Sequence, residues 1–364
     1  TKQAAMQFWK KLCVTFKLMG FRRSKADPGI HFAYTKLGMV IFLSWVDDML
    51  ICGPHDAVQK AKAQFRTHFD VDEQGELKEY VGCKIERDNG MIRWTQPVMI
   101  QSFSDEFNIN VNNHPPNPAQ AGDVLDKEEG EQLTPDQASK YRSGVGKLIH
   151  MMRWSRNDIL NSVRELTRFM SCPRDAHYKR MIRTMEYVYH TRHIGNILKP
   201  KGKWNGPEDP ITIAIITDSE LSSDPDNRHS VLGVTVTVNG TPVKCVSKMH
   251  KGTILSITEG ELVSGVEGVQ DALYCVQVFE SFGIRVNFPM VWTTDNKGAK
   301  DLVDNWSTNG RTRHIATRIN FMRELKESGK LISKWVPGTE MPSDMFTKNL
   351  GGSPYEKHRG FYVG

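Results

Sequence analysis

The chain has 364 residues, 39% hydrophobic and 25% charged, with a formal net charge of +6. This length gives room for two or three domains of ordinary size, whose cores need no disulfide staples. No stretch approaches the length of a membrane span and no signal peptide is present, so we expect no membrane partner. The six cysteines form no C-x-x-C pair, which argues against a zinc ribbon and favours reduced thiols in a reducing, aqueous compartment. The mildly basic balance is compatible with a nucleic-acid partner but does not by itself indicate one.

The first hundred residues alternate between helix and strand patterns. Apolar residues at helical spacing over residues 3–20 predict an amphipathic helix that ends at Gly20. Strand-like runs follow at 31–36, 39–46 and 49–53, then a helix at 56–69, a hairpin over 75–96 that turns at Asp88-Asn89-Gly90, and a helix at 100–107. Because the first residue is Thr and the chain opens directly into a helix, we expect a piece of a longer polypeptide.

Asp47 and Asp48 lie side by side between two largely apolar runs, 42–46 and 49–52. Two adjacent carboxylates with few polar neighbours repel each other and resist burial. One interpretation is a tight β-hairpin that keeps both charges in water, since Asp is a common turn residue. The other is a divalent-metal site, in which the cation cancels the charge and takes part in chemistry. These residues alone leave both interpretations open.

The middle of the chain changes character twice. Residues 110–137 are polar, rich in Pro and Asn, and acidic toward their end, which indicates a linker or a strap lying on the surface. Residues 138–195 then predict three helices, with Asn157-Asp158 and Asp175 among the expected caps. We interpret the Lys and Arg residues between 142 and 156 as solvated helix faces.

From residue 211 the pattern predicts a separate α/β domain of about 150 residues, an ordinary domain size. The order is a strand at 211–220, a hairpin over 231–248 that turns at Asn239-Gly240, a long helix at 258–283, a strand at 289–296, helices at 297–306 and 314–330, a strand at 331–337 and a helical turn from 342.

Four acids in this second half follow or open predicted elements. They are Asp218, Glu261, Asp295 and Asp344. Any one of them could cap a helix or turn the chain. Strands that run side by side bring their ends together, however, so these carboxylates should converge, and a converging cluster is unstable unless cations lie among it. Two Mg²⁺ ions would stabilise the cluster, activate a water and steady a leaving oxygen in phosphodiester hydrolysis.

Four segments of this half resemble the acid motifs of ribonuclease H in Ty1/copia retrotransposon polyproteins. They are TDSE (217–220), ITEGELVSG (257–265), TTDNKGA (293–299) and KWVPGTEMPSDMFTKNL (334–350). The segment RTRHIATRINFMRE (311–324) is also typical of copia elements. The resemblance implies a mixed five-stranded sheet with helices, and it makes the four acids both catalytic residues and metal ligands.

The first half resembles the reverse transcriptase of the same elements. The matching segments are TKQAAMQFW (1–9), SWVDDMLICG (44–53) for the Y-V-D-D hairpin, GELKEYVGCKI (75–85) for the strand pair that grips the primer, and residues 141–170 for the helices before ribonuclease H. The resemblance covers nearly the whole chain except residues 110–137, and its wording is most similar to the copia-like elements of diatoms. It implies an α/β and α+β chain in four parts: a partial palm (1–110), a linker (111–137), a helical thumb or connection (138–204) and a ribonuclease H domain (205–364).

The resemblance also implies roles for individual residues. Asp47 becomes a catalytic metal ligand of the polymerase and Asp48 its catalytic, supporting neighbour. Eight residues become nucleic-acid contacts: Trp45, Gly82, Ser256, Thr258, Asn296, Arg311, Arg313 and His314. Each active site is expected to take two Mg²⁺ ions, with Mn²⁺ as an alternative. The implied partners are an RNA–DNA hybrid, primer–template nucleic acid and the rest of the polyprotein, and the implied location is cytoplasmic virus-like particles and the nucleus.

Three departures from the family pattern bear on function. A further polymerase Asp and the fingers lie upstream of the first residue, so we expect no polymerisation by this chain alone. Trp45 replaces the Tyr of the hairpin motif, which we expect to have a modest effect. The loop after Trp335-Val336-Pro337 lacks the His of retroviral ribonucleases H, and His314, the nearest substitute, is better interpreted as a helix-start residue.

The predicted function is endonucleolytic cleavage of RNA in RNA–DNA hybrids, with RNA-directed DNA polymerisation only if the missing part is supplied. An alternative from a different class is an exapted nucleic-acid-binding or scaffold protein without catalysis. Four repelling carboxylates argue against this alternative, because a scaffold gains nothing from them.

Overall fold

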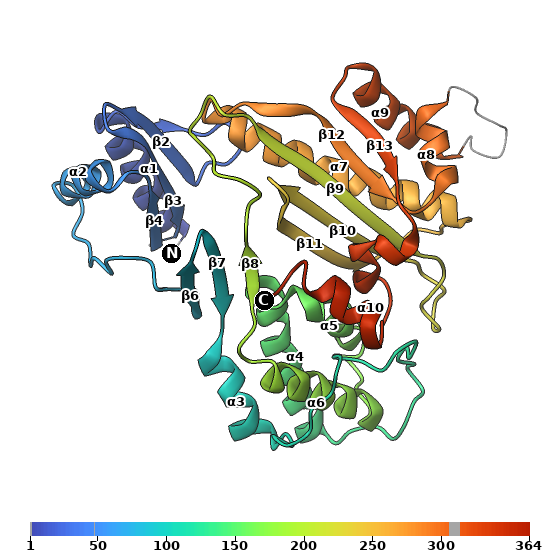
Figure 1. The fold of residues 1–364 in the computed structure, drawn as a ribbon. Coiled ribbons are helices and arrows are strands. Elements are labelled where there is room, and N and C mark those ends of the chain that lie inside the picture. The colour runs from blue at the N-terminus through green and yellow to red at the C-terminus, as the bar shows by residue number, and fades with distance from the viewer. Residues whose placement is uncertain (1, 47, 306–313) are drawn as a thin grey trace. The chain divides into compact units, whose positions relative to one another are not determined.

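The computed structural model describes residues 2–46, 48–305 and 314–364. Its chain divides into two compact units (Figure 1), and each is described by itself. The first unit comprises residues 1–76, 205–210 and 273–286, and the second comprises residues 77–204, 211–272 and 287–364. None of the helices in the described ranges combines the length and apolarity that crossing a bilayer requires.

The first unit is a four-stranded antiparallel sheet with two helices. Its main elements are α1 (Lys2–Leu18), β1 (Arg22–Arg23), β2 (Ile30–Thr35), β3 (Gly38–Trp45), β4 (Asp48–Cys52) and α2 (His55–Arg66), with strand order β1-β2-β3-β4. The predicted helical spacing of α1 buries Leu12 and Phe16, which pack in one core with Phe42 of β3 and Phe65 of α2. The helix–hairpin–helix order predicted here is confirmed.

The second unit opens with a small sheet and a group of helices. The sheet, in strand order, is β5 (Glu79–Tyr80), β6 (Cys83–Asp88), β7 (Met91–Thr95) and β8 (Asn196–Leu198). The helices are α3 (Pro97–Phe107), α4 (Pro135–Trp154), α5 (Leu160–Thr167) and α6 (Asp175–His190). The predicted turn between β6 and β7 is confirmed, with positive φ at both Asn89 (44°) and Gly90 (78°), as a type I′ turn requires.

The segment 110–137 packs against these helices as a strap. Ala119 and Leu125 are only 2% exposed. Arg168 donates a hydrogen bond to the Leu125 carbonyl at 3.2 Å, and His177 Nε2 lies 2.8 Å from the Asp126 carbonyl oxygen. Of the two interpretations of this segment, the structure agrees with the strap.

For Arg156, the prediction that the Lys and Arg residues between 142 and 156 form solvated helix faces is wrong. Its guanidinium is 1% exposed and donates two hydrogen bonds, of 2.7 and 2.8 Å, to the Asp158 carboxylate. The Tyr187 hydroxyl donates to the same carboxylate at 2.7 Å, so Asp158 is a buried ion-pair partner rather than the helix cap we expected. A fully buried guanidinium is tolerated because its donors have partners, which the sequence pattern does not reveal.

The rest of the second unit is built on a mixed five-stranded sheet. In sheet order its strands are β11 (Thr241–Met249), β10 (Val231–Val238), β9 (Ile211–Glu220), β12 (Val286–Thr294) and β13 (Leu331–Trp335). β10 pairs antiparallel with both β9 and β11, whereas β12 and β13 are parallel. The other elements are α7 (Ile257–Ser281), α8 (Lys297–Asp304), α9 (Ala316–Glu327), the 3₁₀ helices η3 (Gly338–Glu340) and η4 (Pro342–Phe346), and α10 (Gly352–Arg359) (Figure 1). Residues 273–281 of α7 belong to the first unit. The predicted fold class is confirmed.

Two glycines let α7 approach this sheet closely. A Cβ at Gly265 would lie 2.6 Å from the Trp292 ring, and one at Gly268 would lie 2.5 Å from Ile215 Cγ2. Trp292 is fully buried and donates a hydrogen bond of 2.9 Å to Thr217 Oγ1. The close approach brings the first turns of α7 beside the ends of β9 and β12.

Candidate metal centre

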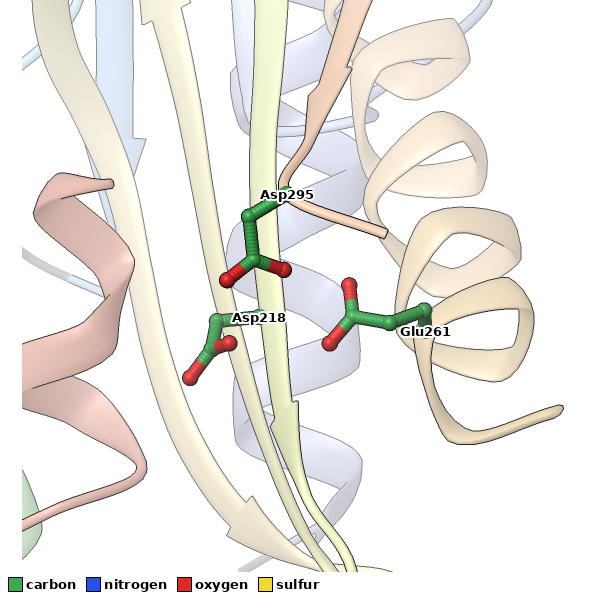
Figure 2. Close-up of side chains that lie close together, drawn as sticks. All are labelled: Asp218, Glu261 and Asp295. Atoms are coloured by element: carbon green, nitrogen blue, oxygen red, sulfur yellow. The ribbon is translucent and has the colours of Figure 1, made fainter. Parts of the chain in front are cut away.

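Three of the four predicted acids meet at the ends of neighbouring elements. Asp218 lies near the end of β9, Glu261 in the early turns of α7, and Asp295 directly after β12. One carboxylate oxygen from each lies within 4.8 Å of the others. Figure 2 shows the three side chains gathered from β9, α7 and the end of β12. Asp218 and Glu261 are 2% and 1% exposed, and Asp295 is partly buried. Carboxylate oxygens in this number and spacing suit a hard divalent cation such as Mg²⁺.

Neighbouring hydroxyl and amide groups fix the Glu261 carboxylate. Its Oε1 accepts hydrogen bonds from the Ser219 backbone N–H (2.7 Å) and hydroxyl (2.9 Å). Its Oε2 accepts one from the Thr294 hydroxyl at 3.0 Å. Both hydroxyls belong to residues next to a predicted acid, so the strands that carry Asp218 and Asp295 also hold Glu261 in place.

Burial and repulsion from neighbouring acids raise the pKa of all three carboxyl groups. Burial, followed by repulsion from Asp218 and Asp295, raises the pKa of Glu261 well above its usual range. Burial also raises the pKa of Asp218, where Asp344 and Asp295 add repulsion and Lys348 opposes the rise. Burial and Asp344 raise the pKa of Asp295. A group of buried carboxyls whose pKa values all rise together is a site that a cation would stabilise.

The fourth acid, Asp344, is not a member of this three-acid group, although its charge acts on Asp218 and Asp295. It sits in η4, and its Oδ1 forms an ion pair with Lys348, which lies four residues further on, beyond the end of η4. Lys348 Nζ also lies 3.3 Å from Glu220 Oε2 and 3.7 Å from Asp218 Oδ2. The structure therefore brings Asp344 to the same site through a lysine, and its predicted role as a metal ligand stays a prediction.

Sequence reasoning missed Lys348 and Thr347. The Thr347 hydroxyl donates a hydrogen bond to Asp218 Oδ2, and Lys348 provides the site's cationic side chain. The signal was present, since Lys348 follows Asp344 at the i,i+4 spacing at which a lysine and an acid pair on a helix. The predicted helical turn gave no reason to place that lysine against Asp218.

The predicted nucleic-acid contacts of the second unit lie around α7 and α8. Ser256 Oγ accepts a hydrogen bond from the Glu259 backbone N–H (3.1 Å), which makes it the cap of α7. Thr258 Oγ1 lies 3.4 Å from Asn296 Oδ1, and that same oxygen accepts the Ala299 N–H and caps α8. His314 Nε2 lies 3.2 Å from Glu259 Oε2, so this histidine contacts an acid outside the three-acid group.

The other predicted site residues lie in the β3–β4 hairpin, in the β5–β6 turn, or outside the residues that the structure describes. Trp45 is 71% exposed at the end of β3 and pairs with Asp48, so the polymerase-like hairpin exists as geometry. Gly82 follows Val81 in the β5–β6 turn, and both have positive φ (71° and 50°). Asp47, Arg311 and Arg313 lie outside the described residues.

The five-stranded sheet, α7 and the three converging carboxylates define an α/β domain that carries a candidate metal centre. Residues 1–121 match the reverse transcriptase (RNA-dependent DNA polymerase) family. Over 98% of its length the chain is 28% identical to a retrovirus-related Pol polyprotein from transposon TNT 1-94 of Nicotiana tabacum. It is 26% identical, again over 98% of its length, to that of transposon RE1 of Arabidopsis thaliana. The predicted resemblance to Ty1/copia-type polyproteins is thereby confirmed.

The chain spans about a quarter of these relatives, 27% and 24% of their lengths. Two solved structures also align with it. One is LC11-RNase H1 in complex with an RNA/DNA hybrid, 13% identical with a TM-score of 0.30, covering 38% of this chain and 94% of that chain. The other is a foamy viral protease-reverse transcriptase in complex with double-stranded DNA, 9% identical with a TM-score of 0.41, covering 81% of this chain and 46% of that chain.

Proposed function

We propose that this chain cleaves the RNA strand of RNA–DNA hybrids by divalent-metal-dependent hydrolysis. The observation that carries the proposal is the convergence of Asp218, Glu261 and Asp295, with one oxygen from each within 4.8 Å of the others. A bound Mg²⁺ or Mn²⁺ ion would supply an activated water and offset the charge that develops on the phosphate. The three carboxylates would hold the ion, and the hydrogen bonds from Ser219 and Thr294 fix the orientation of Glu261.

Polar groups beside the acids support a hybrid as the substrate. Thr258 and Asn296 lie within 3.4 Å of each other, and Asn296 directly follows Asp295. We propose that these two side chains contact the RNA strand, where a 2′-hydroxyl distinguishes RNA from DNA. Ser256, which caps α7 as Asn296 caps α8, is proposed to take part in the same contact.

The test is cleavage of an end-labelled RNA–DNA hybrid with Mg²⁺, beside matched RNA–RNA and DNA–DNA duplexes. We expect cutting of the hybrid alone, and its loss in Asp218→Asn and Asp295→Asn. Asp271→Asn is the matched control, because Asp271 lies on α7 in an ion pair with Lys244 at 2.5 Å and outside the three-acid group. Unchanged cleavage by both site variants would overturn the assignment. Hybrid binding without cleavage by the folded protein would favour the exapted binding protein.

For the first unit, we propose that the β3–β4 hairpin contributes polymerase carboxylates only when the upstream part of the polymerase is supplied. Asp48 opens β4, is exposed, and faces Trp45 across the strand pair. Primer extension on an RNA template tests this. The chain alone should fail to extend the primer, and a longer polypeptide should extend it and lose activity with Asp48→Asn. Extension by the chain alone would overturn this proposal.

A further inference from the structure

Lys348 places a positive charge inside the candidate metal centre. Its Nζ lies 3.7 Å from Asp218 Oδ2 and 3.3 Å from Glu220 Oε2, and it forms an ion pair with Asp344 Oδ1. Asp218 also belongs to the three-acid group, so one carboxylate faces both the lysine and the place where a metal ion would lie. The lysine side chain is 37% exposed, which leaves it a path to solvent.

The segment that carries Lys348 is held on both sides. Before it, the Thr347 hydroxyl donates to Asp218, and the Lys348 backbone N–H donates to the Asp344 carbonyl at 3.0 Å. After it, the Asn349 amide donates to both oxygens of the buried Glu165 carboxylate, at 3.0 and 3.1 Å. Because the residues on both sides of Lys348 have hydrogen-bond partners of their own, the backbone holds the lysine beside the acids.

Asn349 also connects this segment to the strap. Its Nδ2 donates to the Asp123 carbonyl at 2.6 Å, and its Oδ1 accepts from Asn161 Nδ2 at 2.9 Å. The Asn349 carbonyl accepts the Gly122 N–H at 2.9 Å. The strap and α5 thus fix the backbone from which Lys348 reaches the acids.

We propose that Lys348 is a built-in cation that occupies the Asp218–Asp344 side of the site. The nucleic-acid-free protein then takes one divalent ion between Asp218, Glu261 and Asp295, and a second ion has to displace the ammonium group. An ammonium and a divalent cation cannot share Asp344 Oδ1, because like charges a few ångströms apart repel strongly in a partly buried site. The inference rests on the proposed function for the identity of the site as a metal centre.

The test counts Mn²⁺ ions bound without nucleic acid, at one fixed pH near neutrality, by calorimetric titration and by electron paramagnetic resonance. We expect one tight ion in the wild type and two in Lys348→Met, with a spin-coupled signal from the pair. The second ion should bind about tenfold or more tightly in Lys348→Met than in the wild type, since its competitor is gone. Lys348→Arg should behave as the wild type.

Lys179→Met is the matched control. Lys179 also forms an i,i+4 pair, with Asp175, so the variant loses the same charge from the same kind of pair away from the acids. It should bind one ion. As a second variant, Asp344→Asn should leave the affinity of the first ion within about twofold, because the lysine and not the ion is the partner of Asp344.

Two tight ions in the wild type, or an unchanged count in Lys348→Met, would overturn the inference, as would loss of the first ion in Asp344→Asn. Hybrid cleavage measured on the same preparations separates this from the proposed function. Cleavage with an unchanged ion count leaves the proposed function standing without the inference. If the wild type binds one ion and Lys348→Met binds two, but neither cleaves the hybrid, the inference is supported and the proposed function is overturned. A wild type that binds no ion overturns both.

Discussion

Replacing Glu261 by Gln should stabilise the metal-free protein at alkaline pH. The pKa of Glu261 rises from its usual 4.5 to about 8, chiefly through burial and then through Asp218 and Asp295. At 1.36 kcal/mol per pH unit this corresponds to about 5 kcal/mol of destabilisation when the group is ionised. The Gln amide is neutral but replaces one acceptor with a donor. It therefore loses a hydrogen bond from Ser219 or Thr294, a cost of about 1–3 kcal/mol. The expected net gain is roughly 2–4 kcal/mol.

The sign of the pH dependence follows from proton counting. Between the usual and the raised pKa the folded protein binds more protons at Glu261 than the unfolded chain does, so wild-type stability falls as pH rises through this window. The Gln variant lacks this slope. Its advantage should therefore be present at about pH 8.5 and vanish or reverse at about pH 6, where the wild-type carboxyl holds its proton.

The measurement is unfolding in EDTA at both pH values, followed by calorimetry, and repeated with Mg²⁺. Mg²⁺ should stabilise the wild type and not Glu261→Gln. The matched control is Glu267→Gln, since Glu267 lies on the same helix in an ion pair with Lys248 at 2.5 Å. That variant should be slightly less stable at both pH values. The reasoning would be refuted if Glu261→Gln were less stable than the wild type at alkaline pH. It would also be refuted if the stability difference between the two proteins were the same at both pH values.

Three further substitutions test other parts of the second unit by urea unfolding. Arg156→Met should lower the free energy of unfolding by about 3–5 kcal/mol because it leaves the buried Asp158 carboxylate without its partner. Adding Asp158→Leu should restore much of the lost free energy, and no recovery would count against a paired charge. Gly265→Ala should lower it by about 1–3 kcal/mol because the new Cβ meets a buried ring at 2.6 Å; a neutral result would mean that the helix can shift. Asn349→Ala should lower it by about 1–3 kcal/mol by leaving Glu165 short of donors, and an unchanged midpoint would show that the amide is dispensable.

The hairpins were predictable because their chemistry is local. Asn239 and Gly240 adopt positive φ (48° and 76°) in the two-residue turn between β10 and β11, as the sequence indicates. Strand β8, by contrast, has three residues and exists because it pairs with β7 across about a hundred residues of chain. Three residues are too few to show an alternation of apolar and polar side chains, and the partner strand β7 lies too far away in the sequence for a local pattern to reveal the pairing.

The site divides in the same way. Asp218 and Asp295 were predictable because an acid at a strand end is a local pattern. Glu261 was predictable because it lies in the first turns of a long helix. The ion pair of Asp344 with Lys348 was not predictable, because the position of Lys348 is fixed by Asn349 and by contacts far away in the sequence. A motif orders residues along the chain, whereas a metal centre depends on which side chains compete for the same carboxylate.

Comparing Asp48 with the three-acid group shows why burial is a better guide to a metal centre than adjacency in the sequence. Asp48 lies exposed at the start of a hairpin strand, where water solvates its charge and no cation is needed to keep it there. Asp218 and Glu261 are distant in the sequence, almost fully buried, and directed at one point with Asp295. Of these described acids, the buried group has a folded-state cost that a cation would remove. The hairpin can gain such a need when nucleic acid or another part of a polymerase covers it, and this is why its test requires the longer polypeptide.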